Sequence, residues 1–152
     1  MPVDQYLLHL LDLIDKYGWA VQGVLGGESK SEPPFSYTVG LTTLGHPEFI
    51  IQGMPARYAQ HLLNALGEEV RQGRRYLANT TTADATEASA PVALIAVDDP
   101  SALLAAAQLY GEVEALQVIW PDPDGHLPWD EGYPNPAWVQ PFLGPVPTTF
   151  DA

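Results

Sequence analysis

Prolines and tryptophans are concentrated toward the C-terminus of this chain. Eight of its 15 prolines lie between Pro121 and Pro147, and three of its four tryptophans lie between Trp120 and Trp138. Proline lacks the backbone N–H that helices and sheet ladders need, so this stretch cannot form a helix or a central strand. Its aromatic side chains are too large and apolar for a solvated linker. We therefore expect an ordered coil that lies against a sheet or a partner, with regular structure confined to the residues before it.

The residues before this segment show helical periodicity in three stretches. In each of them apolar residues recur three or four positions apart, the pattern of a helix with one buried face. Each stretch stops at a glycine, and Pro55, Asp99 and Pro100 stand where helix starts favour them. Helices are therefore expected over residues 3–17, 55–73 and 98–110.

Alternating apolar and polar residues predict strands between these helices. Four are expected, over residues 19–25, 35–41, 48–53 and 113–120. The polar loop at residues 26–34 makes a wide antiparallel hairpin the simplest connection of the first two. A short apolar run at residues 91–97 is expected as an edge strand, and residues 78–90, which lack periodicity, as a flexible loop.

Length and composition fit one folded domain. The chain has 152 residues, of which 46% are hydrophobic and 16% charged, which is a globular mixture and not a disordered one. A chain of this length buries roughly 68 to 70% of the surface that its unfolded form exposes. The order of elements predicts a single α+β domain over residues 1–152, with about three helices, a mainly antiparallel sheet of four to five strands and a Pro/Trp-rich C-terminal coil.

The sequence also bounds the cellular setting. It contains no cysteine, which excludes disulfides, thiolate metal sites and cysteine nucleophiles. Its N-terminus lacks the positive region of an export signal, and its longest apolar stretches fall far below the ~20 residues of a membrane span. We therefore expect a soluble, cytoplasmic protein that does not bind membranes.

The charge of the chain bears on its partners. Nineteen acidic residues stand against six basic ones, which gives a formal net charge of -13. Proteins contact the phosphates of nucleic acids and anionic lipids largely through lysine and arginine, so no nucleic-acid partner is expected. The expected partner is another protein or a second copy of this chain.

The densest group of charged side chains lies in residues 122–131. Four carboxylates and His126 fall within it. The Asp-x-Asp-Gly start resembles a calcium loop and makes Asp122 and Asp124 candidate metal ligands, but the prolines and the missing later ligands depart from that motif. The alternative is a turn in which Asp122 and Asp124 bond their own backbone and Gly125 adopts a positive φ.

A second group of candidate residues surrounds the sequence His-Pro-Glu. His46 and Glu48 are residue types that act as acid and base or hold a divalent cation, yet their spacing matches no established metal motif. Tyr37 adds a hydroxyl on the preceding strand, where the alternating pattern alone explains it. The sequence contains neither a Gly-x-Ser-x-Gly elbow nor a phosphate-binding glycine motif.

Several of these residues carry a family resemblance. The strand Tyr37–Leu41 followed by His46–Glu48, and the turn Trp120–Asp122 followed by Pro128–Trp129, are similar to motifs of the bacterial domain-of-unknown-function family 4262. The resemblance covers about residues 18–143. Because the family has no assigned function, it implies no catalytic residue. It does imply that these segments form one spatial unit.

Two classes of function remain. The first is a binding or interaction module that uses the C-terminal coil, with candidate contact residues Trp120, Asp122, Asp124, Trp129 and Trp138. The alternative is a small hydrolase or metal-dependent enzyme that uses His46 and Glu48, with Tyr37 as a further candidate, together with Asp122 and Asp124. That alternative requires the two groups to share one pocket. No cofactor is expected.

Overall fold

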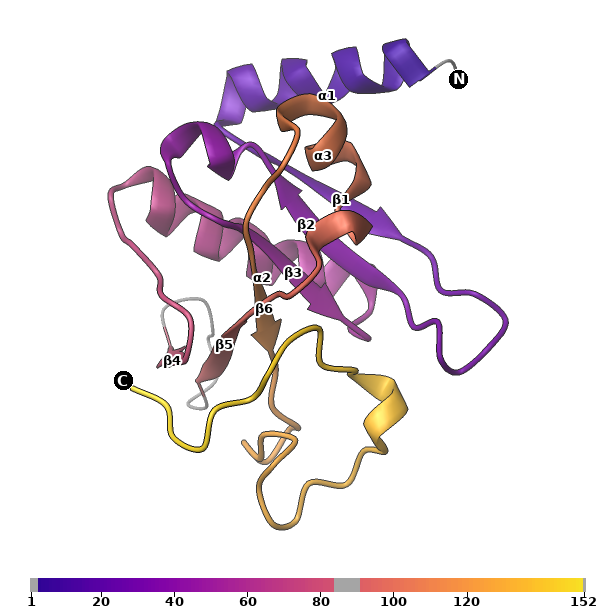
Figure 1. Cartoon of the computed structure of the whole chain (residues 1–152), viewed down its shortest axis with the longest axis vertical. Helices are drawn as coiled ribbons and strands as arrows, with labels where there is room; N and C mark the ends of the chain where they lie inside the picture. Colours follow the sequence, from indigo (N-terminus) through magenta and orange to yellow (C-terminus); the bar gives the residue numbers. More distant parts are fainter. Residues whose placement is uncertain (1–2, 84–90, 152) are drawn as a thin grey trace.

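The computed structural model describes residues 3–83 and 91–151 of the chain (Figure 1). Its α-helices are α1 (Val3–Tyr17), α2 (Ala56–Arg71) and α3 (Leu104–Tyr110). Its strands are β1 (Ala20–Val24), β2 (Phe35–Val39), β3 (Glu48–Gln52), β4 (Thr80–Thr82), β5 (Val92–Ala96) and β6 (Ala115–Ile119). Short 3-10 helices lie in the connections: η1 (Leu41–Leu44), η2 (Pro100–Ala102) and η3 (Ala137–Val139). None of the described helices combines the length and apolarity needed to cross a bilayer.

The strands form one mixed sheet in the order β1-β2-β3-β6-β5-β4. β3 and β6 run parallel, whereas the other neighbouring pairs are antiparallel. The predicted α+β class and mainly antiparallel sheet are therefore confirmed, and so is the wide hairpin that joins β1 to β2. The sheet has six strands, slightly more than the four to five expected.

The additional strand, β4, lies in the segment predicted as a flexible loop. Its three threonines show no apolar alternation, so β4 depends on pairing with β5 on one side and on a bridge from Thr80 to Asp151 on the other. β5 consequently lies inside the sheet and not at its edge, because β4 and β6 flank it. Residues 84–90 of the predicted loop lie outside the described residues.

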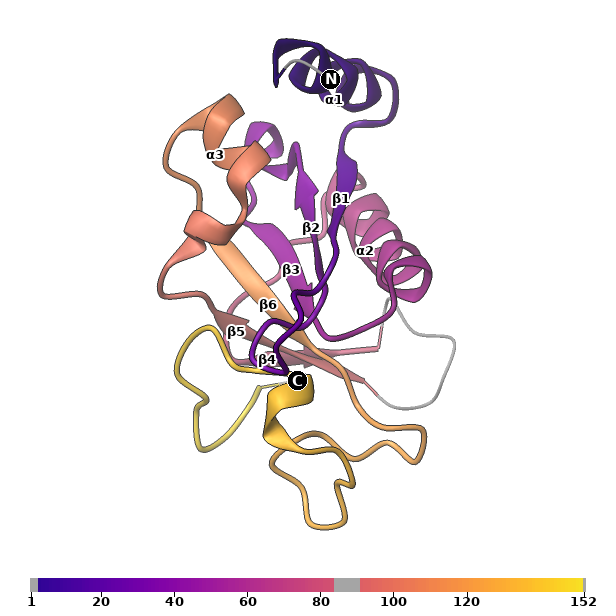
Figure 2. The same ribbon diagram turned by 90° about the vertical axis from the view of Figure 1, so that its right-hand side faces the viewer.

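Different elements cover the two faces of the sheet (Figure 2). α2 packs on one face, where Leu63 and Leu66 meet Phe49 and other buried side chains of the strands. α1 and α3 pack on the other face around Ile50. A third cluster, centred on Ile119, is covered by apolar residues of the C-terminal coil. The coil thus covers part of the sheet that no helix reaches, as expected from its composition.

The helix predicted over residues 98–110 is interrupted. It begins as η2, where the Asp99 carboxylate accepts a hydrogen bond from the Ser101 N–H at 3.0 Å. Leu103 then leaves the helical region, with φ -80° and ψ 64°, and its side chain is fully buried. The α-helix proper starts only after this residue. The helix is thus interrupted at a residue whose side chain is fully buried in the core.

Candidate functional site

Two glutamine side chains fasten the C-terminal coil to the sheet. The Gln117 amide, on β6, donates to the Pro141 carbonyl at 2.8 Å and accepts from the Leu143 N–H at 2.7 Å. Gln140 lies in the coil and bonds to the residue after β6: its side-chain amide accepts from the Trp120 N–H at 2.8 Å and donates to the Trp120 carbonyl at 3.1 Å. Both glutamines are buried. Each side-chain amide thus pairs with one backbone N–H and one backbone carbonyl, Gln117 with the coil and Gln140 with Trp120, as a neighbouring strand would.

Two glycines allow the coil to approach the sheet closely. Gly53 follows β3 with φ +80°, and a Cβ added there would lie 1.9 Å from the carbonyl oxygen of Val139. A Cβ added at Gly144 would lie 1.9 Å from the carbonyl oxygen of Ala96. Since real Cβ atoms do not approach oxygen so closely, both positions require glycine for the coil to sit where it does.

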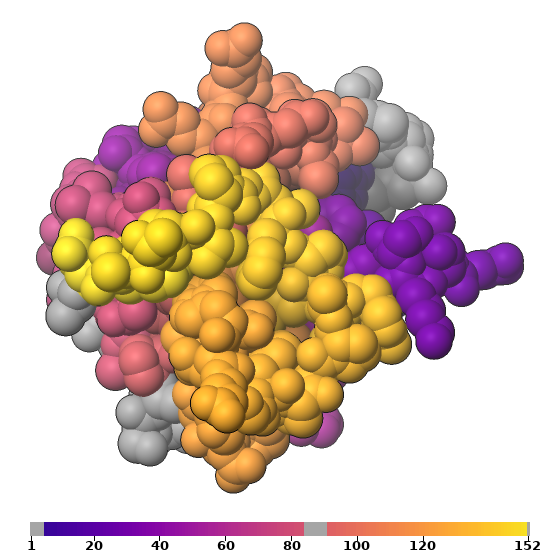
Figure 3. Space-filling model, turned by 60° about the horizontal axis from the view of Figure 1, so that its bottom comes forward, coloured from indigo at the N-terminus to yellow at the C-terminus, as the bar shows by residue number. Residues whose placement is uncertain are grey.

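The outer surface of the coil carries partly exposed aromatic rings. We call the exposed surface of residues 121–150 the coil face; Figure 3 shows it in orange and yellow. Trp129 is 37% exposed and stacks on Phe150 with ring centroids 4.9 Å apart. Phe142, 44% exposed, contacts the same indole at 6.0 Å. Beside it lies a cavity of about 330 Å³ lined by prolines, Tyr133 and Phe142. The coil face therefore combines partly exposed, mutually packed aromatic side chains with a cavity.

The other two tryptophans of the coil differ in their surroundings. Trp120 is partly buried and its indole N–H donates to the Gln52 carbonyl at 2.7 Å, so it links the coil to the end of β3. Trp138 on η3 is 46% exposed, and the Lys30 ammonium lies 5.0 Å from its ring centroid. Trp120 is thus a packing residue, whereas Trp138 presents its ring to solvent and to a cation.

The coil face is acidic. Residues 121–150 contain four carboxylates and no lysine or arginine. Asp124, Asp130 and Glu131 are exposed. These residues give the coil a negative charge, although the Lys30 ammonium lies over Trp138.

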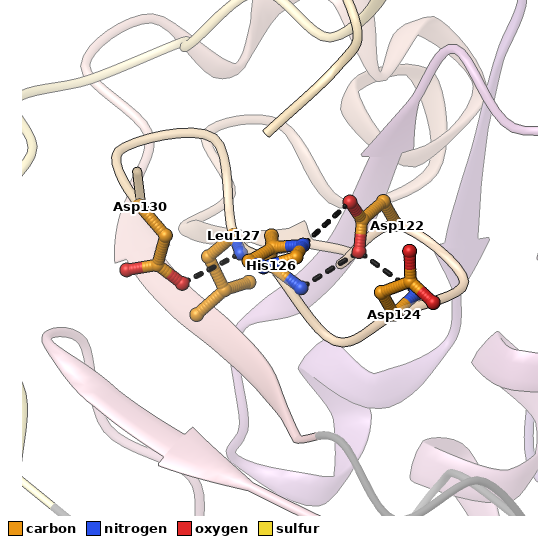
Figure 4. A network of polar contacts seen from close by, with 5 residues as sticks. All are labelled: Asp122, Asp124, His126, Leu127 and Asp130. Carbon is orange, nitrogen blue, oxygen red and sulfur yellow. Dashed lines mark hydrogen bonds and ion pairs between the residues drawn. The ribbon is translucent and has the colours of Figure 1, made fainter. Parts of the chain in front are cut away.

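Asp122 closes a tight turn at the start of the coil (Figure 4). Its Oδ1 accepts from the N–H groups of Asp124 at 3.0 Å and His126 at 2.7 Å, and its Oδ2 lies 2.9 Å from His126 Nδ1. The Gly125 N–H donates to the Asp122 carbonyl at 3.0 Å, with φ +89° at the glycine. These contacts are those of the predicted turn, except that Asp124 contributes its N–H and not its carboxylate.

The same turn brings together three residues of types that bind metal ions. Ligand atoms of Asp122, Asp124 and His126 lie within 4.8 Å of one another. Burial raises the pKa of Asp122, but the hydrogen bonds from His126 and Asp124 outweigh it, and the pKa lies below its usual value. Because bonds within the turn already use both Asp122 oxygens, a cation would have to displace His126. The geometry favours the turn over a metal site.

His46 is held by backbone groups on both sides of its ring. The Tyr76 N–H donates to Nε2 at 3.0 Å, so Nε2 carries no proton, and Nδ1–H donates to the Pro47 carbonyl at 2.8 Å. The ring also packs against Phe49 and Tyr76. Burial, with a smaller contribution from the charge of Arg75, lowers the pKa of His46. This neutral imidazole has no free nitrogen to offer a substrate.

Glu48 is fully buried and surrounded by donors. The Thr38 hydroxyl (2.8 Å) and the Leu41 N–H (3.1 Å) donate to Oε1. The Gly40 N–H (3.1 Å), the Thr42 N–H (2.9 Å) and the Thr42 hydroxyl (2.6 Å) donate to Oε2. Burial raises the pKa of Glu48 and these donors oppose the shift. The carboxylate caps the amides at the start of η1, which is a structural role.

The two groups of candidate residues do not share a pocket. The parallel register pairs Glu48 with Ala115, so His46 and Glu48 lie where β3 and β6 begin. Asp122 comes after the last residue of β6, at the opposite end of the same strands. The Tyr37 strand adjoins Glu48, because β2 pairs with β3 and the Thr38 hydroxyl donates to Glu48, whereas the Asp122 turn lies at the other end of the strands from His46 and Glu48. Spacing along the chain did not reveal that β3 and β6 are parallel neighbours.

Tyr37 lies on the opposite face of the sheet from His46. It is 2% exposed and packs in the cluster on the α1 and α3 face, whereas His46 packs on the α2 face. Its hydroxyl accepts a hydrogen bond from the Ala105 N–H at 3.0 Å. Burial raises the pKa of Tyr37, and the bond from Ala105 opposes the shift. The tyrosine thus joins β2 to the start of α3.

The sequence did not predict the roles of the glutamines that hold the coil or of the threonines that donate to Glu48. Gln140 and Gln52 cannot be recognised from the sequence, because a glutamine in a coil or a strand resembles any other polar residue. Gln117 lies in the strand predicted over residues 113–120, and that prediction assigns it no role. The one available signal was its position in the middle of an otherwise apolar strand, where a buried amide needs a partner.

Comparison with known proteins identifies the family. The chain matches the family model described as Domain of unknown function (DUF4262) over residues 13–134. No curated protein and no solved structure matches it at a significant level. The matched range contains the six described strands and the Asp122 turn and stops before Trp138. Since it spans most of the 152 residues, the chain belongs to the DUF4262 family.

Proposed function

We propose that this protein is a protein-binding module whose coil face docks a basic segment of a partner protein. One observation carries the proposal. The coil is fastened by Gln117 and Gln140, yet it leaves Trp129, Trp138 and Phe142 partly exposed. A coil whose only role was to cover the sheet would have no need to present these rings to solvent.

The rigidity of the coil supports binding. Trp129 is fixed between Phe142 and Phe150, and η3 is held against Gly53. Aromatic side chains that are ordered before binding lose little entropy when a partner covers them, and such residues dominate the energetics of interfaces. The cavity of about 330 Å³ beside Phe142 offers a place for one apolar or proline side chain of the partner.

Charge indicates which partner fits. The coil face contributes carboxylates and no basic residue of its own, so it attracts a segment rich in lysine or arginine. A second copy of this chain carries the same acidic coil and would be repelled there. The partner chemistry is therefore a basic, proline- or leucine-containing peptide segment.

The alternative function has no comparable support. A hydrolase or metal-dependent enzyme would need His46 and Glu48 to act with Asp122 and Asp124. The sheet separates these pairs, and hydrogen bonds from the chain itself occupy the His46, Glu48 and Asp122 side chains.

Selection from a random-peptide display library tests the proposal. The wild-type protein is the bait, and counter-selection uses the Trp138→Ala, Phe142→Ala double variant. We expect enrichment of peptides with several lysines or arginines beside proline or leucine. The enriched peptides, once synthesised, should bind wild type in calorimetry and lose at least about tenfold in affinity for the double variant, because truncation of interface aromatics commonly removes that much.

The matched control is Leu104→Ala on α3, which truncates a side chain that is 61% exposed and does not belong to the coil. It should bind the selected peptides as wild type does. Circular dichroism must show that all variants are folded. Enrichment without a basic bias, or equal affinity for wild type and the double variant, would contradict the proposal.

A further inference from the structure

A lysine of the chain itself lies over the most exposed tryptophan. The Lys30 ammonium is 5.0 Å from the Trp138 ring centroid, within the range of a cation–π interaction. Lys30 belongs to the loop between β1 and β2, and Trp138 to η3. Within the part of the chain that the structure describes, Lys30 forms no ion pair, although the chain has an excess of 13 negative charges. The indole is therefore what this cation contacts.

The space around this contact is a small pocket. It has a volume of about 210 Å³ and is lined by Lys30, Glu32, Trp138 and Val139 together with Gly26, Gly27 and Gly53, among others. The glycines add no side chain to its walls. The Glu32 side chain lies against Gly27, where an added Cβ would be 2.0 Å from Oε2. An aromatic face and a carboxylate thus border one cavity, which suits a cationic side chain.

We infer that Lys30 occupies the subsite that a lysine or arginine of the partner takes on the coil face. The inference rests on the proposed function and adds that a cationic side chain of the partner binds over the Trp138 ring. When the partner docks, its cation replaces Lys30 over the Trp138 ring and Glu32 accepts its charge. Lys30 then moves into solvent with its loop, whose tip is exposed.

The arrangement predicts an unusual sign for one substitution. Removal of Lys30 should strengthen the binding of a basic ligand, because the ligand no longer competes with a cation already in place. One exposed cation–π contact corresponds to about a two- to fivefold change in affinity. A general loss of positive charge acts only through space and is screened beyond about 8 Å at physiological salt.

Titration with acetylated tetralysine amide tests the inference. Lys30→Gln should bind this probe about two- to fivefold more tightly than wild type, the value of one such contact. The matched control is Lys16→Gln on α1, which removes the same charge from an exposed site beside Asp12 and should leave the affinity unchanged. In NMR spectra of wild type, the ring current of Trp138 should shift the Lys30 side-chain protons upfield, and tetralysine but not tetraglutamate should reverse this shift.

Two results would overturn the inference. One is an affinity of Lys30→Gln no higher than that of Lys16→Gln. The other is the same gain from Lys30→Gln in a Trp138→Ala background, which would show that the indole is not involved. If the selected peptides still require Trp138 and Phe142, the proposed function stands and only the role of Lys30 falls. If no basic peptide is enriched, both fall.

Discussion

The parallel strands β3 and β6 carry a carboxylate and a histidine at each end, and the two groups differ in what holds them. At the end where the strands begin, Glu48 is fully buried and accepts five hydrogen bonds, three of them from backbone amides. His46 lies nearby but bonds only to backbone groups. Beyond the other end, Asp122 contacts His126 directly, and the His126 side chain is 38% exposed.

This difference shows that residue type alone does not define the chemistry of a site. A buried carboxylate with five donors is a structural cap, and an imidazole whose nitrogens both contact backbone is a packing residue. In the turn after β6 the Asp122 carboxylate is also buried, but its partner His126 is a side chain that keeps contact with solvent. We refer to the two sets as the Glu48 group and the Asp122 group, and the following predictions test how strongly each holds its part of the fold.

The largest effect is expected from Glu48→Ala. It would leave three amides and two hydroxyls buried without an acceptor, and we expect the free energy of unfolding to fall by about 3–5 kcal/mol. Urea denaturation followed by circular dichroism measures the loss. Glu112→Ala, at an exposed position, serves as the control and should change stability little. A loss below 1 kcal/mol, on the order of a single exposed bond, would mean that water reaches the five donors.

A smaller loss is expected from Gly53→Ala at the coil end of the strands. The new Cβ would meet the Val139 carbonyl, and alanine disfavours the φ of +80°. We expect a loss of about 2 kcal/mol, comparable to other strained backbone positions. Hydrogen exchange should speed up in η3 and leave the amides bonded to Glu48 protected. Equal acceleration at both ends would show that the coil and the sheet unfold as one unit.

Asp122→Ala should destabilise less than either. Its two N–H donors lie in a turn near solvent and can turn to water, so we expect a loss of about 1–2 kcal/mol. The location of the chemical-shift changes is the more specific measurement. The amide chemical shifts of Asp124 and His126 should change, and those around Glu48 should stay the same. Asp122→Asn, which keeps an acceptor, should recover part of the stability. No difference between alanine and asparagine would argue against hydrogen bonding as the cause.

The smallest effect concerns pH. The pKa of His46 is lowered in the folded protein, so below its ordinary value of 6.5 the unfolded chain takes up a proton first and stability falls as the pH falls. Glu48 acts in the opposite sense because its pKa is raised. The slope from one such group cannot exceed about 1.4 kcal/mol per pH unit. The difference between wild type and His46→Gln isolates the histidine, and parallel stability curves between pH 7 and about 5 would contradict this assignment.

Asp122 contributes a second dependence of stability on pH, at more acidic values. Its pKa is lowered from the ordinary 3.8, so its contribution to stability is present above that pH and is lost as the pH falls through the folded value. The wild type should therefore lose stability twice on acidification, first through His46 and then through Asp122. Asp122→Asn should lack the second loss alone.

Local periodicity was enough to predict most of the fold. The stripes of α1 and α2 and the alternation of β2 and β6 depend only on neighbours in the sequence, and these elements appear close to their expected bounds. β4 could not be predicted in this way, because Thr80–Thr82 become a strand only through β5 and Asp151. Its stabilising contacts come from residues far along the chain.

In the candidate site, too, only contacts between residues close in the sequence could be predicted. The Asp122 turn was accessible because its partners are at most four residues away. The roles of His46 and Gln117 were not, since their partners Tyr76 and Pro141 lie 30 and 24 residues away. Whether the two groups meet depended on strand order, which no local pattern encodes.

The spacing of the Glu48 hydrogen bonds has a consequence for how the chain folds. Its donors lie only 6 to 10 residues away, so β2, η1 and β3 can join with a short loop closure. The bond from the Trp120 indole to Gln52 spans 68 residues, and those of Gln117 span 24 and 26. The first unit can therefore form before the chain beyond Trp120 finds its place. The coil is expected to dock last, and the aromatic surface is completed only after the sheet beneath it exists.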